Sequence, residues 1–188
     1  MQKTSHFIAI EIKPELFSNI FSAVYLYLKN NNILEYFIFQ NILSLHITLY
    51  YLPENITSTQ EKFLVKDIKN TQISSKIFSE NIWYFRNNKN NYSHLYFAVK
   101  TQNNLSKIFS DFHNTYNCAE IHENNLEYTA HINFLKILDS KIFLEHQKNI
   151  EKIIFSELNK IKNINISHWN ISLYVVNSHF WNEIQIKI

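Results

Sequence analysis

The chain has 188 residues, of which 46% are hydrophobic, and a formal net charge of +2. This length predicts one compact domain or two small lobes, and the small net charge does not by itself indicate nucleic-acid binding. The single cysteine excludes an intramolecular disulfide and a cysteine-rich zinc site, and the absence of glycine excludes a glycine-rich phosphate loop or a dinucleotide-binding fingerprint.

Hydrophobic periodicity predicts strands and helices that alternate along the chain. A strand over 6–12 precedes a helix that begins at Pro14, because proline suits a first helical turn, and ends near residue 29. A capping-box pattern at Thr57 or Ser58 predicts a helix to about residue 69. The other expected strands cover 34–39, 43–52, 73–85, 93–99, 126–137, 165–176 and 183–188, and the other expected helices cover 104–116 and 140–160. This alternation predicts an α+β fold.

Because glycine is absent, we expect asparagine to occupy most turn positions that need a positive φ. Asparagine clusters at 30–32 and 87–91 lie where such turns are expected. No apolar stretch reaches the roughly 20 residues of a membrane span, and the N-terminus lacks the pattern of a signal peptide. We therefore expect a cytoplasmic protein that has no membrane segment.

Two similar triplets carry the chemical signal. His46-Ile47-Thr48 and His131-Ile132-Asn133 each lie in an apolar run that favours a strand. Because side chains alternate across a strand, each histidine shares a face with the polar residue two positions later. Two such strands can line one groove, which suits in-line displacement at phosphorus with one histidine as base and the other as acid.

The triplet is not unique in this chain. His113-Asn114-Thr115, His122-Glu123-Asn124 and His168-Trp169-Asn170 have the same form. The first is expected on a helix and the second in a polar loop. His168 lies in an alternating, strand-like run and therefore competes with His131 for the second position.

The order of the elements and motifs resembles the 2H phosphoesterase superfamily, in particular its branch of 2'-5' RNA ligases and RNA 2',3'-cyclic phosphodiesterases. Four stretches spread over nearly the whole chain carry the resemblance: 7–16, 46–52, 128–136 and 171–178. It implies one bilobal α+β domain over residues 1–188, in which two similar sheet-plus-helix lobes face across a cleft and each supplies one motif strand. It also favours His131 over His168.

The resemblance implies a phosphodiesterase that needs no metal or cofactor. His46 and His131 would hydrolyse the 2',3'-cyclic phosphate end of an RNA or nucleotide to a phosphomonoester, and in reverse the same pair could join RNA ends. Thr48 and Asn133 would hydrogen-bond the phosphate oxygens, and Lys136 stands where the family commonly has a phosphate-binding arginine. The expected enzyme is a monomer whose partner is its RNA or nucleotide substrate.

Three residues depart from the family pattern. Asn133 replaces threonine or serine, Ala130 replaces a proline, and Lys136 lacks the bidentate fork of arginine. Strict alternation also places Lys136 on the core face, so that it reaches the groove only if the strand bulges or ends. Two other functions stay open: a same-fold enzyme acting on cyclic or 2'-5'-linked oligonucleotide signals, and an inactive RNA-binding or nucleotide-binding module. The aromatics Tyr50, Tyr51, Trp83 and Tyr84 are candidates for stacking on a base, or for the core.

Overall fold

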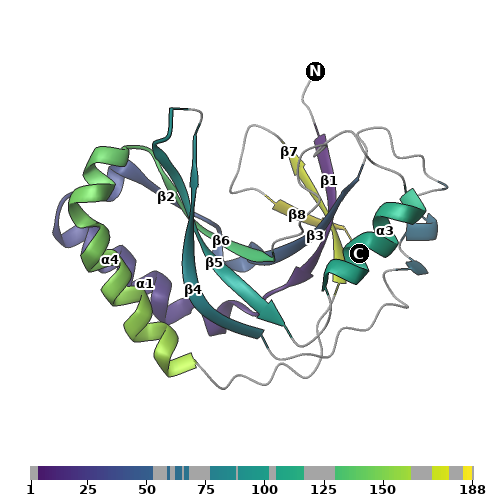
Figure 1. The fold of residues 1–188 in the computed structure, drawn as a ribbon, viewed down its shortest axis with the longest axis horizontal. Coiled ribbons are helices and arrows are strands. Elements are labelled where there is room, and N and C mark those ends of the chain that lie inside the picture. Colours follow the sequence, from purple (N-terminus) through teal and green to yellow (C-terminus); the bar gives the residue numbers. More distant parts are fainter. Residues whose placement is uncertain are drawn as a thin grey trace.

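A computed structural model describes residues 4–52, 59, 62–64, 66–67, 77–87, 89–101, 105–116, 130–161, 171–177 and 184–187. The fold is α+β, with an antiparallel sheet and helices packed against it (Figure 1). The strands are β1 (Thr4–Glu11), β2 (Phe37–Phe39), β3 (His46–Leu52), β4 (Ile77–Arg86), β5 (Tyr92–Thr101), β6 (His131–Ile137), β7 (Ile171–Asn177) and β8 (Ile184–Lys187). The helices are α1 (Ser18–Asn30), α3 (Leu105–Tyr116) and α4 (Ser140–Ile161), with short 3-10 turns η1 (Pro14–Leu16), η2 (Leu34–Tyr36) and η3 (Ile42–Ser44).

The sheet brings the two motif strands to its centre. Its strand order is β4-β5-β6-β3-β1-β7-β8, and the short strand β2 also pairs with β6. Strands far apart in the sequence therefore lie side by side, because β3 pairs with β6 on one side and with β1 on the other. The helices α1 and α4 lie at one end of the molecule and α3 at the other (Figure 1).

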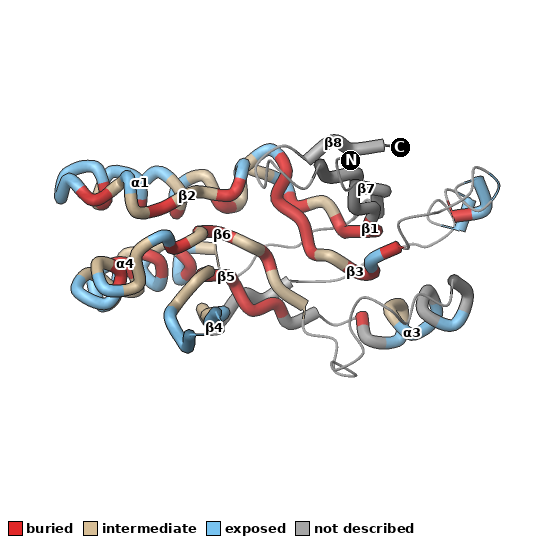
Figure 2. Tube along the Cα trace, turned by 90° about the horizontal axis from the view of Figure 1, so that it is seen from above, coloured by how far each residue is buried: buried red, intermediate tan, exposed pale blue. Residues whose placement is uncertain are grey.

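One apolar core joins the sheet to its helices. Each helix contributes a stripe at helical spacing, such as Ile20, Val24 and Leu28 on α1, and these residues are fully buried. The core face of β5 and β6 meets α1 through aromatic rings: Phe97 lies 5.0 Å from the ring of Phe17, and Phe134 packs edge-on against Phe21. The buried positions follow these strands through the middle of the molecule (Figure 2).

The predicted elements agree with the structure except near their ends. The strand expected over 34–39 begins as the 3-10 turn η2, where Tyr36 N–H donates to the Ile33 carbonyl, and only Phe37–Phe39 is extended. The strand expected over 43–52 likewise starts with η3, and β3 begins at His46 itself. In both cases a local hydrogen bond forms a 3-10 turn where the alternation of apolar residues predicts an extended strand. The capping residues Thr57 and Ser58 and the expected strand positions 126–129 and 165–170 lie outside the described residues.

Asparagine takes the positive-φ positions, as the absence of glycine predicts. Asn32 has φ of 56° directly after α1, and Asn90 has φ of 61° in the turn between β4 and β5. Asn87 supports that turn, because its side-chain oxygen accepts from the backbone N–H groups of Lys89 and Asn91. Among the described helices, none is both long enough and apolar enough to cross a membrane.

Candidate active site

The two motif strands are direct neighbours. β3 and β6 run antiparallel and pair at the central residues of the two triplets, Ile47 with Ile132. Both isoleucines are fully buried on the core face. The residues on either side of each isoleucine therefore lie on the other face of the sheet.

The register sets the four polar motif residues into one cluster. Continuing the Ile47–Ile132 pairing by one residue in each direction places His46 opposite Asn133 and Thr48 opposite His131. The two histidines are then diagonal neighbours, which in an antiparallel pair lie roughly 7–8 Å apart. The charge of His131 acts on His46, which agrees with this proximity of the two triplets. The sequence predicts a shared face for each pair, and the structure joins the two pairs.

A β-bulge on β6 brings Lys136 to the same face. In the ladder with β5, His131 pairs with Ala98 and Asn133 with Tyr96, but the next pairs are Leu135 with Leu95 and Lys136 with His94. Phe134 is the extra residue, so Phe134 and Leu135 are both buried in succession. Paired residues share a face, and the bulge therefore aligns Lys136 with His131 and Asn133. Strict alternation fails here because two consecutive apolar residues enter the core.

β3 contains a similar β-bulge. Thr48 pairs with Ala9 and Tyr50 with Ile8, which leaves Leu49 as the extra residue. Tyr51, five positions after His46 as Lys136 is after His131, therefore lies on the face of His46 and Thr48. Its ring is 39% exposed. Burial raises the pKa of the Tyr51 hydroxyl, and a hydrogen bond with Thr48 opposes that rise.

The bulges also decide which further side chains share the motif face. Tyr51, His94 and Tyr96 lie on it, and of these only Tyr51 was predicted from the sequence, as a candidate for base stacking or for the core. One sequence feature could have indicated the bulges. Each His-x-polar triplet is followed by two residues of apolar character, Leu49-Tyr50 and Phe134-Leu135. A pair of core residues in succession is what a bulge accommodates.

His46 is buried and held by one defined hydrogen bond. Only 7% of the residue is exposed, and its Nδ1 lies 2.7 Å from the Ser44 carbonyl oxygen. Because a carbonyl only accepts, Nδ1 carries the proton, and in the neutral ring Nε2 then carries the lone pair. Burial, opposed by the Ser44 bond and reinforced by the charge of His131, lowers the pKa of His46 from 6.5 to about 4. Glu11, half-buried on β1, stands opposite His46 in the register.

A chain of buried polar groups ties His46 to the β6 bulge. The buried polar residues of the described part of the chain are Gln40, Ser44 and His46. Gln40 N–H donates to the carbonyl of Phe134, the bulge residue, and its side-chain amide donates to Ser44 Oγ at 3.3 Å. Ser44 in turn accepts from His46 through its carbonyl. Since buried polar groups require partners, this chain fixes the orientation of His46 relative to the second motif.

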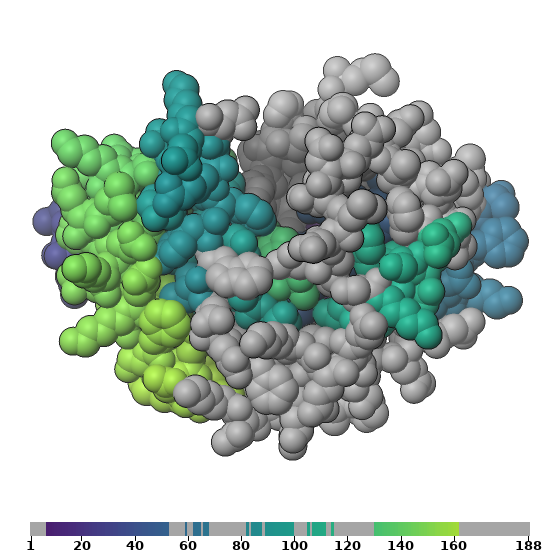
Figure 3. All heavy atoms as spheres, in the orientation of Figure 1, coloured from purple at the N-terminus to yellow at the C-terminus, as the bar shows by residue number. Residues whose placement is uncertain are grey.

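His131 has a different setting. It is half-buried, and its ring meets two aromatic rings of the neighbouring strands edge-on: Phe85 at 5.5 Å and Tyr96 at 5.0 Å between centroids. Phe85 and Tyr96 themselves lie close together, at 4.4 Å and an angle of 31°. Phe85 is 42% exposed. In the space-filling view, atoms in the colours of the β4–β5 hairpin and β6 reach the surface near the middle of the face (Figure 3).

The structure places some of the other histidines and aromatic residues that the sequence offers as candidates. His113 lies in α3 as expected from its periodicity, while His122 and His168 are outside the described residues. Tyr50 is buried and packs on Phe109, and Tyr84 donates to Glu151 of α4. Both therefore serve the packing of helices on the sheet. The side chain of Trp83 is outside the described set.

No group of three or more histidine, cysteine, aspartate or glutamate side chains in the described part of the chain could hold a metal ion. The motif face carries the imidazoles of His46, His94 and His131, the hydroxyls of Thr48, Tyr51 and Tyr96, the Asn133 amide, the Lys136 ammonium group and the Glu11 carboxylate.

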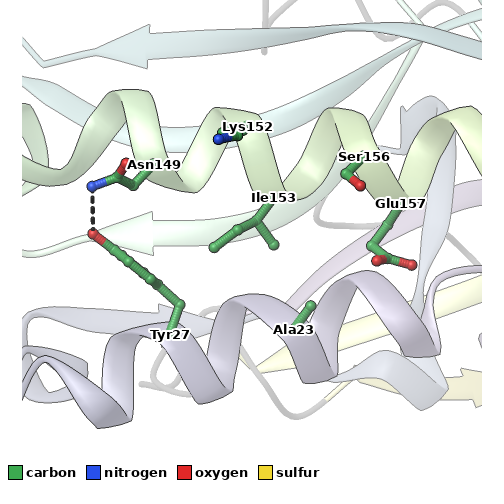
Figure 4. Close-up of a pocket in the computed structure, with 7 residues that line it drawn as sticks. All are labelled: Ala23, Tyr27, Asn149, Lys152, Ile153, Ser156 and Glu157. Atoms are coloured by element: carbon green, nitrogen blue, oxygen red, sulfur yellow. Dashed lines mark hydrogen bonds between the residues drawn. The ribbon is translucent and has the colours of Figure 1, made fainter.

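A cavity lies away from the motif residues. This cavity of about 540 Å³ opens between α1 and α4 and is lined by Ala23, Tyr27, Asn149, Lys152, Ile153, Ser156 and Glu157 (Figure 4). The Tyr27 hydroxyl, which bonds His146 Nδ1 at 2.8 Å, also accepts from the Asn149 amide at 3.1 Å. These bonds join the two helices. No motif residue lines this cavity.

Comparison with known proteins bears on the fold. The sequence matches no protein-family profile and no curated protein. Among solved structures, a conserved protein of unknown function from Agrobacterium tumefaciens is similar over 100% of this chain and 86% of its own, with a TM-score of 0.59 and 11% identity. The protein TT0787 of Thermus thermophilus is similar over 98% of this chain and 95% of its own, with a TM-score of 0.54 and 10% identity.

A third similar structure is Usb1 of Kluyveromyces marxianus, solved with uridine monophosphate. It matches over 98% of this chain and 97% of its own, with a TM-score of 0.50 and 10% identity. At these identities the likeness concerns the fold alone. The chain therefore shares, over nearly its whole length, the α+β fold of these three proteins.

Proposed function

We propose that the protein is a metal-independent 2H-type phosphodiesterase that hydrolyses 2',3'-cyclic phosphate ends of RNA or nucleotides to phosphomonoesters. The observation that carries the proposal is the pairing of Ile47 with Ile132, which sets one imidazole and one polar side chain of each motif on a single face. The shared fold supports it, since one protein of that fold was solved with a nucleoside monophosphate.

The two histidines divide the proton transfers. His46 is neutral near pH 7 because its pKa is about 4, and its Nδ1–H is committed to Ser44. Its Nε2 is therefore suited to take a proton from the attacking water. His131, the more exposed imidazole, then protonates the leaving ribose oxygen. When the 5'-hydroxyl of another RNA end takes the place of water, the same pair joins the two ends. His46 takes the proton of that hydroxyl as its oxygen bonds phosphorus, and His131 protonates the ribose 3' oxygen as its bond to phosphorus breaks, which leaves a 2'-5' bond.

The bonds and protons balance without a further reactant. Water loses a proton to His46 as its oxygen bonds phosphorus, and the bond from phosphorus to one ribose oxygen breaks as that oxygen receives a proton from His131. Thr48 and Asn133 donate hydrogen bonds to the non-bridging oxygens, where negative charge builds up. Lys136, on the same face, offers the substrate a positive point charge in place of the bidentate fork of arginine. Proton exchange with solvent returns both histidines to their starting states.

We further propose that the chain is a single bilobal domain. One lobe comprises β2, β4, β5 and β6 with α1 and α4, and the other comprises β1, β3, β7 and β8 with α3. This division is supported by the packing of α3 on β3 and of α4 on β4 and β5. The β3–β6 junction would then be the floor of the cleft between the lobes.

The test is turnover of uridine 2',3'-cyclic phosphate, followed by ³¹P NMR. A phosphomonoester should form, and its formation should stop in the double variant His46→Ala/His131→Ala. A panel of 2'-5'-linked and cyclic oligonucleotides, assayed in parallel, distinguishes an enzyme of the same fold that acts on such signals. RNA binding without turnover of any of these substrates would establish the binding-module alternative instead.

A further inference from the structure

The motif face extends beyond the two triplets to a pair of basic side chains. His94 on β5 and Lys136 on β6 are partners in the antiparallel ladder. They share the face of His131 and Asn133, because the bulge at Phe134 restores the alignment of the two strands. The ring of Phe85 contacts both His94, at 6.4 Å, and His131, at 5.5 Å, and so connects this pair to the reaction centre.

The two basic groups are close enough to influence each other. Burial, and then the charge of Lys136, lower the pKa of His94. Both residues are half-buried, and His94 Nδ1 lies 3.1 Å from Ser93 Oγ. Within the described part of the chain, no carboxylate lies at ion-pair distance from Lys136. Two neighbouring basic groups set in a partly desolvated face are suited to an anion, which favours the charged form of both.

The position of this pair relative to the triplets indicates which anion it would bind. Along β6 the order is His131, Asn133 and Lys136, and Lys136 lies about two pleat positions, or roughly 7 Å, beyond Asn133. The phosphate held between His46 and His131 is therefore not the one nearest to His94. A second phosphate on the same nucleic-acid strand lies within reach of both basic side chains.

We propose that His94 and Lys136 form an anion subsite that binds a second phosphate of an oligonucleotide, next to the phosphate that reacts. The proposal rests on the proposed function and deepens it: the preferred substrate is an oligonucleotide end that carries an internal phosphodiester, in preference to a cyclic mononucleotide. The exposed ring of Phe85 lies between the two phosphate positions.

The experiment compares two substrates that differ by one nucleotide. Uridine 2',3'-cyclic phosphate has only the reacting group, and the dinucleotide UpU ending in the same cyclic phosphate adds one uridine and one phosphodiester. The variants of His94 and Lys136 separate the effect of the phosphodiester from that of the added uridine. The wild-type protein should show a higher kcat/KM for the dinucleotide. His94→Gln and Lys136→Gln should each lower the ratio of the two kcat/KM values by about tenfold, since each removes a charged hydrogen bond to the added phosphate from a half-exposed position. Lys136→Arg should keep the preference.

Lys148→Gln is the matched control, because Lys148 is an exposed lysine of α4. It removes the same net charge and should leave the ratio unchanged. Thermal unfolding of each variant checks that it is folded. A ratio that is the same in His94→Gln, Lys136→Gln and wild type overturns the subsite, and so does an equal loss on both substrates.

Failure of the proposed function has a different signature. If the wild-type protein hydrolyses neither substrate, binding of the dinucleotide UpU and of the nucleoside uridine is measured by calorimetry. Tighter binding of UpU that is lost in His94→Gln and Lys136→Gln then supports the subsite while the phosphodiesterase is rejected. No difference between these variants and wild type in that binding overturns the subsite as well.

Discussion

β3 and β6 carry the same arrangement of side chains, but they place their histidines in different surroundings. Each strand has a histidine, a polar residue two positions later, a bulge, and a third polar residue at the fifth position after the histidine. His46 is buried and bonded to a backbone carbonyl, while His131 is half-buried between two aromatic rings. In the proposed mechanism the common pattern binds the phosphate, and the difference in surroundings makes His46 the base and His131 the acid.

The setting of His46 arises from what precedes β3. β3 starts directly after η3, whose backbone supplies the carbonyl of Ser44 to His46. A buried imidazole with one N–H bonded to a carbonyl has a low pKa and a fixed tautomer. Similar sequence motifs can therefore hold a base and an acid, because the pKa is set by burial and hydrogen bonds.

The largest expected effect is loss of either imidazole. His46→Ala and His131→Ala should each lower the rate of cyclic-phosphate hydrolysis by about 10²–10⁴-fold. The double variant should fall little further, because groups that act as a unit are not additive. Single-turnover kinetics measure this. Near-normal activity in His131→Ala together with loss in His168→Ala would transfer the second role to His168.

The burial of His46 should also appear in stability. In the unfolded chain its imidazole binds a proton below about pH 6.5, whereas in the folded protein it stays neutral down to about pH 4. The stability that the neutral ring contributes above pH 6.5 is thus lost as the pH falls from 6.5 to 4. The difference corresponds to about 3 kcal/mol in the free energy of unfolding.

Urea unfolding at pH 7 and pH 4 measures this loss in the wild-type protein and in His46→Asn, which cannot titrate. The variant should lose less stability than wild type over this interval, by about 3 kcal/mol. Equal losses in the two proteins would mean that His46 is not held neutral by the fold.

A smaller effect is expected where the two strands differ in their polar residue. Asn133 presents an amide N–H to the phosphate where β3 presents the Thr48 hydroxyl. Asn133→Ala should lower the rate by about 10-fold, less than the 10²–10³ seen for buried oxyanion donors, because the site is only half-buried. Asn133→Thr should match wild type or exceed it. If Asn133→Ala hydrolyses the substrate as fast as wild type while Thr48→Ala is much slower, Asn133 does not bind the phosphate.

The smallest expected effect is that of a chelator. Because the proposed steps use only side chains of β3 and β6, incubation with EDTA should leave the hydrolysis rate unchanged. The rate before and after removal of divalent ions measures this. Activity that is lost to EDTA and restored by a divalent cation would require a different mechanism.

Sequence periodicity predicts the α+β class, most of the elements and the shared face of His46 with Thr48 and of His131 with Asn133. It does not predict that β3 and β6 are neighbours, because pairing between distant strands depends on the whole sheet. Strict alternation also places Lys136 on the core face and puts Tyr51 on the face opposite His46 and Thr48, because it allows for no bulge. The tie from Gln40 through Ser44 to His46 is likewise a tertiary feature, formed where the turn η3 meets the β6 bulge.

The most direct test of the account is the pH dependence of kcat/KM for uridine 2',3'-cyclic phosphate. If His46 is the base, activity should persist as the pH falls through 6.5 and decline only near the pKa of His46, about 4. In His131→Ala the alkaline limb should disappear, while the residual activity keeps an acid limb below pH 6.5, because burial is the main cause of the low pKa. An acid limb at the ordinary imidazole value, or one that moves with the loss of His131 to pH 6.5 or above, would contradict the assignment of His46 as the base.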